Sequence, residues 1–235
     1  MPAGDDGAGR GGDARAVLFD VDGTLVDTNY LHAVCWGEAL RQQGRPVPMA
    51  TVHRAIGMGS QELLDHLLGP DRDHEQDDVL DAAHLALYKQ FWGRLQPLPG
   101  SVALLRKCAG NGLRTVLASS ASEGELAALR SALAADDAIT GATSSDDAGA
   151  GKPAADILLA ALDSVDASVE RSAFVGDSVW DGQAAKKAGL PFVGLTCGGT
   201  SEAELRENGA MEVWRDAEQL LAEWPRSVLS RLGAS

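Results

Sequence analysis

The amino-acid sequence predicts an α/β fold, in which a parallel sheet carries helices on both faces and an all-helical segment is inserted early in the chain. Three observations carry this prediction. Residues 16–19 form a short apolar run that is typical of a buried strand. Residues 29–96 show helical patterns without a strand signal. Residues 101–224 alternate between strand and helix patterns, which is typical of a parallel sheet.

Two carboxylates follow the first predicted strand. Asp20 and Asp22 stand two residues apart, directly before Gly23, where the chain starts to turn. Two like charges that converge on one point repel each other, and one must take up a proton unless a cation lies between them. A hard divalent cation with oxygen ligands, Mg²⁺ above all, removes this conflict. The plainer alternative is a strand that ends in an Asp-Gly turn.

The helical insert is predicted to be a separate small domain. Its first helix ends at Gly44 and Pro46, and Pro97 to Gly100 break the chain after its last helix. The expected helices cover 30–43, 49–56, 61–68 and 75–95. The chain therefore divides into an expected disordered tail at 1–13, a core of 14–28 and 97–235, and a helical domain of 29–96.

The rest of the core is predicted to alternate strands and helices. The expected strands are 113–118, 138–142, 172–175, 191–195 and 212–214, and the expected helices are 101–109, 123–134, 154–162, 183–188, 202–208 and 217–224. In parallel sheets of this kind the ligand site lies at the carboxyl ends of the strands. Asp20, Ser119 and Asp177 each follow a predicted strand, so we expect them to share one site.

Composition excludes several classes of partner. The 235 residues are 45 % hydrophobic, which is enough for a sizeable core. A net charge of −14 repels phosphates, so neither nucleic acid nor a membrane is expected as a partner. The scattered Cys35, Cys108 and Cys197 predict reduced thiols in a cytoplasmic protein. The N-terminal residues lack the basic start and apolar centre of a signal peptide.

Four segments together resemble the motifs of the haloacid dehalogenase-like (HAD) hydrolase superfamily. They are Asp20-Val21-Asp22-Gly23-Thr24-Leu25, Val116-Leu117-Ala118-Ser119, Gly151-Lys152-Pro153 and Val175-Gly176-Asp177-Ser178 with Asp181 beyond it. They occur in the family's order and span nearly the whole chain. The segment 27–32 resembles the hinge of the phosphoglycolate phosphatase and β-phosphoglucomutase branch. The resemblance implies a Rossmann-like core with an inserted helical cap domain.

The resemblance also implies a mechanism. Asp20 would attack the phosphorus of a phosphate ester and form an aspartyl-phosphate, and Asp22 would act as general acid and base. Ser119 and Lys152 would hold the oxygens of the transferring phosphoryl group. The implied cofactor is Mg²⁺, bound by Asp20, Asp177 and the backbone carbonyl of Asp22. The resemblance assigns Asp181 a supporting role, in which it orients metal-bound waters or pairs with Lys152.

A cap that closes on the core would exclude water and contact the substrate. A histidine at the place of His32 contacts the catalytic acid in some relatives, and the loop from Arg54 to Ser60 resembles the cap loop that faces the active site. The candidate substrate-binding residues are Thr24, Ser120, His32, Gly57 and Arg54.

The predicted function is therefore a Mg²⁺-dependent phosphatase that hydrolyses a small phosphorylated metabolite, such as phosphoglycolate, a sugar phosphate or a nucleoside monophosphate. A β-phosphoglucomutase-like phosphosugar mutase is the main alternative, although that branch carries an arginine where this chain has Ser60. A non-catalytic binding protein is a further alternative. The dehalogenase branch fits less well, because it lacks an aspartate at the position of Asp22. The protein is expected to be a monomer or a homodimer.

Overall fold

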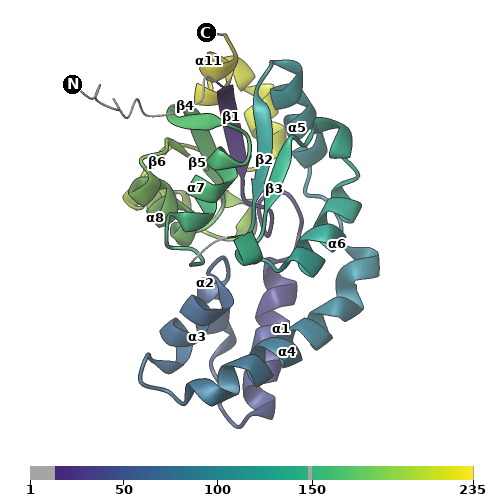
Figure 1. Ribbon diagram of the computed structural model, residues 1–235, viewed down its shortest axis with the longest axis vertical. Helices are drawn as coiled ribbons and strands as arrows, with labels where there is room; N and C mark the ends of the chain where they lie inside the picture. The colour runs from purple at the N-terminus through teal and green to yellow at the C-terminus, as the bar shows by residue number, and fades with distance from the viewer. Residues whose placement is uncertain (1–13, 148–149, 235) are drawn as a thin grey trace, which may run out of the picture.

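The computed structural model describes residues 14–147 and 150–234, and its centre is one parallel sheet flanked by helices (Figure 1). The sheet has six strands in the order β3-β2-β1-β4-β5-β6. They are β1 (Ala14–Phe19), β2 (Arg114–Ala118), β3 (Gly141–Thr143), β4 (Ala167–Gly176), β5 (Phe192–Leu195) and β6 (Ala210–Trp214). The predicted α/β fold class is confirmed. The predicted tail at 1–13 lies outside the described residues.

The register of the central strands aligns their carboxyl ends. Phe19, the last residue of β1, pairs with Leu117 of β2 on one side and with Val175 of β4 on the other. The chain moves outward from β1 in both directions, first to β2 and β3 and then to β4, β5 and β6. Such a reversal of strand order opens a crevice at the carboxyl ends, where ligands bind in sheets of this type.

Helices cover both faces of the sheet. Val17 and Phe19 of β1 pack on one side and Ala16 and Leu18 on the other, all fully buried. Burial on both faces explains why this strand is a continuous apolar run. The first face is covered by α5 (Ser101–Gly110), α6 (Glu123–Leu133), α10 (Ala217–Ala222) and α11 (Val228–Ala234), and the second by α7 (Asp156–Asp163), α8 (Val179–Ala188) and α9 (Glu202–Glu207).

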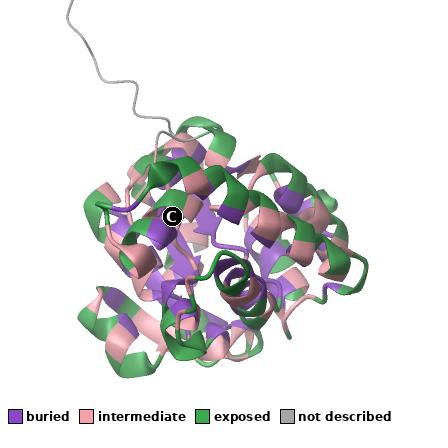
Figure 2. Cartoon of the chain, turned by 90° about the horizontal axis from the view of Figure 1, so that it is seen from below, coloured by how far each residue is buried: buried purple, intermediate pink, exposed green. Residues whose placement is uncertain are grey.

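The helical segment lies below the carboxyl ends of the strands (Figure 1). It contains α1 (Asn29–Gln42), α2 (Met49–Ala55), α3 (Ser60–Leu68), α4 (Asp77–Tyr88) and the 3₁₀ helices η1 (His74–Gln76) and η2 (Lys89–Arg94). A separate apolar cluster holds these helices together, with Trp36, Leu40, Val52, Leu64 and Leu80 among its buried members. Seen from below, exposed residues gather around the rim of the molecule and buried ones lie toward the middle (Figure 2).

Several boundaries differ from the predicted ones. The helix expected over 75–95 is divided into η1, α4 and η2, and Phe91 and Trp92 of η2 pack on the core cluster. The helix expected from residue 183 begins at Val179, after a capping box of Ser178 and Asp181. The strand expected over 138–142 is shorter and shifted to β3, and α11 was not predicted.

No helix among the described residues combines the length and the apolar character that a membrane span requires.

Candidate active site

Two strand ends, one helix start and one loop bring four charged side chains together. Asp20 follows β1, Asp177 follows β4, and Asp181 lies in the first turn of α8. Lys152, from the loop before α7, is fully buried and forms ion pairs with Asp20 and with Oδ1 of Asp181, the latter at 2.8 Å. The sequence predicted that these residues belong to one site, and the fold places them side by side.

Asp20 carries a strongly perturbed carboxyl group. Its pKa is raised to about 7, chiefly by burial and also by the neighbouring carboxylates of Asp181 and Asp22, whereas Lys152 opposes the rise. Its backbone N–H donates to the carbonyl oxygen of Val175 at 2.9 Å, which fixes the residue at the strand end. Asp20 is therefore held rigidly, with its charge only partly compensated by protein groups.

Asp177 lies in the same cluster without a cationic partner among the described residues. Its Oδ1 accepts a hydrogen bond from the Thr24 hydroxyl at 2.8 Å, and its Oδ2 accepts one from Asn29 Nδ2 at 2.9 Å. Burial raises its pKa well above the usual value, and the charges of Asp20 and Asp181 add to this. A Cβ atom on Gly198 would lie 1.6 Å from Asp177 Oδ2, so only glycine lets the chain pass this carboxylate.

The residues fit a hard metal cation. One carboxylate oxygen from each of Asp20, Asp177 and Asp181 lies within 4.8 Å of the others, and Lys152 is the one ammonium paired with this group in the described chain. Within the part of the chain that the structure describes, the buried Oδ1 of Asn29 has no hydrogen-bond partner, although Nδ2 of the same amide donates to Asp177. Uncompensated carboxylates beside an orphaned amide oxygen form the oxygen-rich donor set that Mg²⁺ prefers.

Asp22 has a different environment from Asp20. Its Oδ1 accepts from the Thr28 hydroxyl at 2.7 Å and lies 3.1 Å from His32 Nε2, and its Oδ2 lies 3.5 Å from the Ser119 hydroxyl. Burial alone would raise the pKa of Asp22, but the charge and hydrogen bond of His32 and the hydrogen bond of Thr28 lower it. The two aspartates of one motif are thus tuned in opposite directions.

A stack of rings supports His32 from the helical segment. His32 Nδ1 lies 3.0 Å from Nε2 of His84, which comes from α4, and the His84 ring stacks on Trp36 with centroids 4.3 Å apart. Tyr88 packs against His32 at 3.9 Å between centroids. Burial lowers the pKa of His84 well below its usual value, so this ring stays neutral at pH 7.

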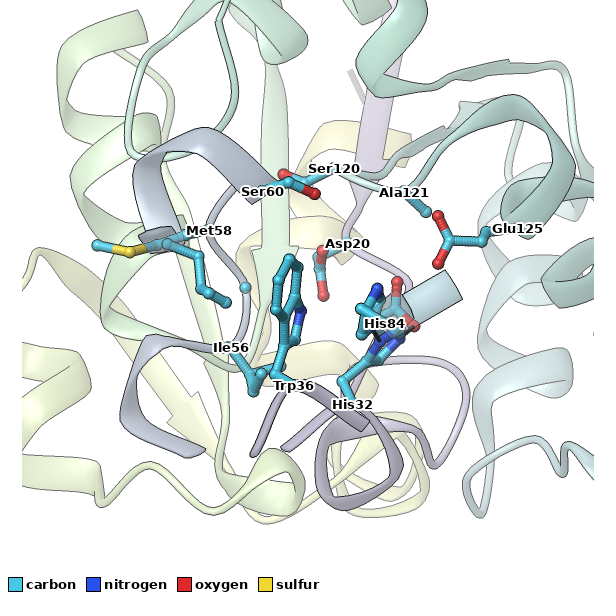
Figure 3. A pocket seen from close by; sticks show the side chains of 13 residues that line it. Asp20, His32, Trp36, Ile56, Met58, Ser60, His84, Ser120, Ala121 and Glu125 are labelled. Atoms are coloured by element: carbon cyan, nitrogen blue, oxygen red, sulfur yellow. Dashed lines mark hydrogen bonds and ion pairs between the residues drawn. The ribbon is translucent and has the colours of Figure 1, made fainter. Parts of the chain in front are cut away.

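A cavity opens beside the two aspartates, between the core and the helical segment (Figure 3). We call it the Asp20 cavity. Figure 3 shows Trp36, Ile56 and Met58 to one side of Asp20, and His84 and Glu125 to the other. Its polar lining residues are Asp20, Asp22, His32, Ser60, His84, Ser120 and Glu125, and its larger apolar ones are Trp36, Ile56, Met58 and Leu63.

The predicted substrate-binding residues separate into two groups. His32, Gly57 and Ser120 line the Asp20 cavity, and the buried Ser120 hydroxyl has no hydrogen-bond partner in residues 14–147 and 150–234. Thr24 and Arg54 do not line it. Thr24 is fully buried and uses its hydroxyl on Asp177, and Arg54 forms an ion pair with Glu204 on the core and lines a second cavity beside Asp177.

The helical segment contacts the core around Lys152. The backbone N–H of Gly59 donates to the Lys152 carbonyl at 3.2 Å, and Glu62 accepts a hydrogen bond from the Gly151 N–H at 3.0 Å. Gly57 has φ +100°, and a Cβ atom on it would lie 2.9 Å from the Ser178 hydroxyl oxygen. These contacts hold the helical segment over the carboxyl ends of the strands.

Three residues that shape the site were missed by the sequence analysis. Asn29 is the first residue of the predicted helical domain, and Glu125 falls inside a predicted helix. The spacing of His84 from the other histidines does not indicate a metal site. Ser122 followed three residues later by Glu125 is a capping-box pattern, so the sequence did place Glu125 in the first turn after β2. Nothing in the local sequence indicates that Asn29 and His84 face the aspartates.

Comparisons with known proteins agree with this fold. Residues 14–189 match the family model of haloacid dehalogenase-like hydrolases. The chain is 31 % identical to the phosphoglycolate phosphatase of Rhodospirillum rubrum over 94 % of this chain and 96 % of that protein. The crystal structure of a hydrolase from Pseudomonas syringae superposes with a TM-score of 0.82 at 31 % identity, covering 90 % of this chain and 98 % of that one. The β-phosphoglucomutase of Clostridium difficile, 19 % identical, shares the fold with a TM-score of 0.80 over 94 % of this chain and 100 % of that one.

Proposed function

Because this chain belongs to the haloacid dehalogenase-like hydrolase family and is a phosphatase of that family, we propose that it hydrolyses a small phosphate monoester through an aspartyl-phosphate on Asp20. The observation that carries the proposal is that the two carboxylates at this strand end have different partners. Asp20 pairs with buried Lys152, whereas Asp22 receives hydrogen bonds from Thr28 and His32. Groups of the same kind with different environments are suited to different catalytic roles.

In the first half-reaction a carboxylate oxygen of Asp20 attacks phosphorus, and the bond from phosphorus to the alcohol oxygen breaks. Asp22 passes a proton to that oxygen, so the alcohol leaves neutral. The proton comes from His32, whose pKa is raised by the Asp22 carboxylate 3.1 Å from its Nε2. Lys152 holds Asp20 in place and offers positive charge to the phosphoryl oxygens. Ser119, whose hydroxyl lies 3.5 Å from Asp22, is placed to donate to the same oxygens.

In the second half-reaction water attacks the phosphorus of the aspartyl-phosphate. Asp22 takes a proton from this water, and the bond from phosphorus to the Asp20 oxygen breaks, which releases phosphate and restores both carboxyl groups. His32 and Thr28 keep Asp22 aimed into the cavity throughout, because they hold one oxygen and leave the other toward Ser119.

We propose that Asp20, Asp177 and the backbone carbonyl of Asp22 hold Mg²⁺, with Asp181 and Asn29 as supporting groups. When bound, this ion would neutralise the carboxylates and the phosphoryl oxygens. Asp181 keeps Lys152 in place through its Oδ1, while its Oδ2 accepts hydrogen bonds from the N–H groups of Asp177 and Ser178.

The helical segment 29–96 acts, in this proposal, as a cap domain. Its contacts with the Lys152 loop and with α8 close the space above the aspartates, and a closed site excludes water and suits small substrates. Phosphoglycolate, a sugar phosphate and a nucleoside monophosphate are the candidate substrate types.

A phosphosugar mutase is less well supported. Such an enzyme handles a bisphosphate, and its second phosphate needs a cationic site. Ser60, which stands where the mutase branch carries arginine, donates its hydroxyl to Asp81 at 2.8 Å. None of the described residues that line the Asp20 cavity is an arginine or a lysine.

The test is hydrolysis of p-nitrophenyl phosphate with Mg²⁺ and with EDTA, by the wild type, Asp20→Asn and a control, Asp27→Asn. Asp27 is exposed and lies on the same segment. We expect Mg²⁺-dependent turnover that falls at least about 10⁴-fold in Asp20→Asn, because the nucleophile is lost, and that persists in the control. Turnover that survives in Asp20→Asn would overturn the assignment of the nucleophile, and a lack of turnover in folded wild type would count against a general phosphatase.

A further inference from the structure

The Asp20 cavity has a charge distribution that bears on which alcohol can leave. Lys152 is fully buried and paired with Asp20 and Asp181, so its charge is committed to the phosphoryl side. His32 faces the cavity, but its Nε2 lies 3.1 Å from the Asp22 carboxylate, whose charge offsets it. His84 is neutral at pH 7, since burial keeps its pKa low.

Glu125 therefore determines the sign of the charge that faces the leaving alcohol in the Asp20 cavity. Its side chain comes from the first turn of α6, is 8 % exposed and lines the cavity. One carboxylate oxygen lies within 4.8 Å of ring nitrogens of His32 and His84 (Figure 3). Among the described residues that line this cavity, no lysine or arginine balances it.

Glu125 also closes a capping box. Its Oε2 accepts hydrogen bonds from the Ser122 N–H at 3.0 Å and from the Ser122 hydroxyl at 2.7 Å. A glutamine in this position can accept the same bonds through its amide oxygen. The capping role therefore needs the shape of the side chain but not its charge, and the two can be separated by substitution.

The other lining groups suit a leaving alcohol without a second anion. The buried Ser120 hydroxyl has no hydrogen-bond partner among the described residues, so it is available to a hydroxyl of the substrate. Trp36, Ile56 and Met58 offer an apolar wall for a short carbon skeleton. A second carboxylate or phosphate would be desolvated here beside Glu125, and no lysine or arginine among the described lining residues would receive it.

Given the proposed phosphatase function, we propose that this cavity selects phosphate esters whose alcohol carries neutral hydroxyl groups or an ammonium group, and that Glu125 is the residue that rejects a second anion. The inference predicts that phosphoglycolate is a poor substrate of this chain, because phosphoglycolate carries a carboxylate on the leaving alcohol. In this the chain would differ from the relatives that are named phosphoglycolate phosphatase.

The experiment compares three two-carbon esters that differ only in the terminal group: 2-hydroxyethyl phosphate, phosphoethanolamine and 2-phosphoglycolate. With Mg²⁺-loaded wild type we expect kcat/KM for 2-phosphoglycolate to be at least about tenfold below that for 2-hydroxyethyl phosphate, because like charges in a partly desolvated site repel. Phosphoethanolamine should match or exceed the neutral ester.

Glu125→Gln keeps the capping group and removes the charge. We expect it to raise the ratio of kcat/KM for 2-phosphoglycolate over 2-hydroxyethyl phosphate about tenfold and to lower the ratio for phosphoethanolamine. A merely structural defect would lower all three together. Glu123→Gln, on the exposed side of the same helical turn, should change none of the ratios.

Two results would overturn the inference while the phosphatase function stands: 2-phosphoglycolate as the best ester of the wild type, or ratios that Glu125→Gln leaves unchanged. Failure to hydrolyse any of the three esters or p-nitrophenyl phosphate would overturn the proposed function and this inference with it.

Discussion

Two buried cations of this chain lie in charge clusters of opposite character. In the core, Lys152 contacts Asp20 and Asp181, with Asp177 beside them, so one ammonium faces three carboxylates. In the helical segment, Arg72 is also buried. It binds both oxygens of Asp77 at 2.9 and 2.8 Å, the Gly69 carbonyl at 3.0 Å and the half-exposed Asp65.

The pKa values express this difference. The pKa of Asp20 is raised to about 7 by burial and by its acidic neighbours, so the core cluster is short of positive charge. The pKa of Asp77 is lowered, chiefly by its hydrogen bonds from Arg72, so the negative charge of Asp77 is compensated by protein groups within the helical cluster. A buried cluster with surplus charge of one sign indicates a ligand site, whereas a balanced and fully hydrogen-bonded one indicates a structural role.

The largest effect should follow loss of the core cation. Lys152→Met should lower kcat about 10³-fold, because one preorganised positive group on the transferring phosphoryl is removed. Steady-state kinetics with p-nitrophenyl phosphate measures this, and Lys187→Met, at an exposed lysine near the same loop, serves as control. A kcat within threefold of wild type would show that Lys152 has no part in catalysis.

Loss of the cation in the helical cluster should act on stability instead. Arg72→Ala should lower the free energy of unfolding by about 3 kcal/mol, because it leaves Asp77 buried without its partner. Urea denaturation measures this, and Mg²⁺ should not restore the loss. Arg41→Ala, at an exposed pair with Glu38, should stay within about 0.5 kcal/mol of wild type. Equal losses in the two variants would contradict the structural role of Arg72.

Asn29→Ala should weaken Mg²⁺ binding about tenfold, because Asp177 loses the amide that orients it. Isothermal titration of the protein with Mg²⁺ measures the affinity directly. Asn111→Ala, where the amide donates to the Lys107 carbonyl far from the site, should bind Mg²⁺ as the wild type does. An unchanged affinity in Asn29→Ala would remove this residue from the metal site.

The ion pair of Asp77 in the helical cluster should also make the free energy of unfolding depend on pH. The folded-state pKa of Asp77 is lowered, so its contribution is fully present above the unfolded value of about 3.9 and is lost as pH falls through the folded value. The difference in unfolding free energy between wild type and Asp77→Asn should therefore shrink as pH falls below about 4. Asp77 also raises the pKa of His74, so a part of the difference should be lost as pH rises through neutrality. A difference that grows as pH falls below about 4 would show the opposite sign of coupling.

The smallest effect is expected for Arg54, one of the predicted substrate-binding residues. Its ion pair with Glu204 is half exposed and lies away from the Asp20 cavity. Arg54→Ala should change kcat/KM for small phosphate esters by less than about threefold, since exposed pairs contribute little. A larger loss, with unchanged stability, would return Arg54 to the substrate site.

Much of the core could be predicted because its signals are local. Strand segments buried on both faces must be apolar, so residues 16–19 of β1 and 173–175 of β4 stand out in the sequence, whereas the polar first half of β4 does not. Where the helices of the helical segment begin and end was harder to predict. The expected long helix over 75–95 has suitable periodicity, but packing of Phe91 and Trp92 on the core decides where the α-helix ends.

The sequence by itself determined the sheet, the helical insert and the candidate residues at the strand ends, because parallel strands bring their carboxyl ends to one edge. The tertiary structure alone decided how those residues are partnered. Asn29 reaches Asp177 across 148 residues of chain, His84 reaches His32 across 52, and Arg54 reaches Glu204 across 150. Such contacts depend on how the helical segment sits on the sheet, and local propensity carries no information about that placement.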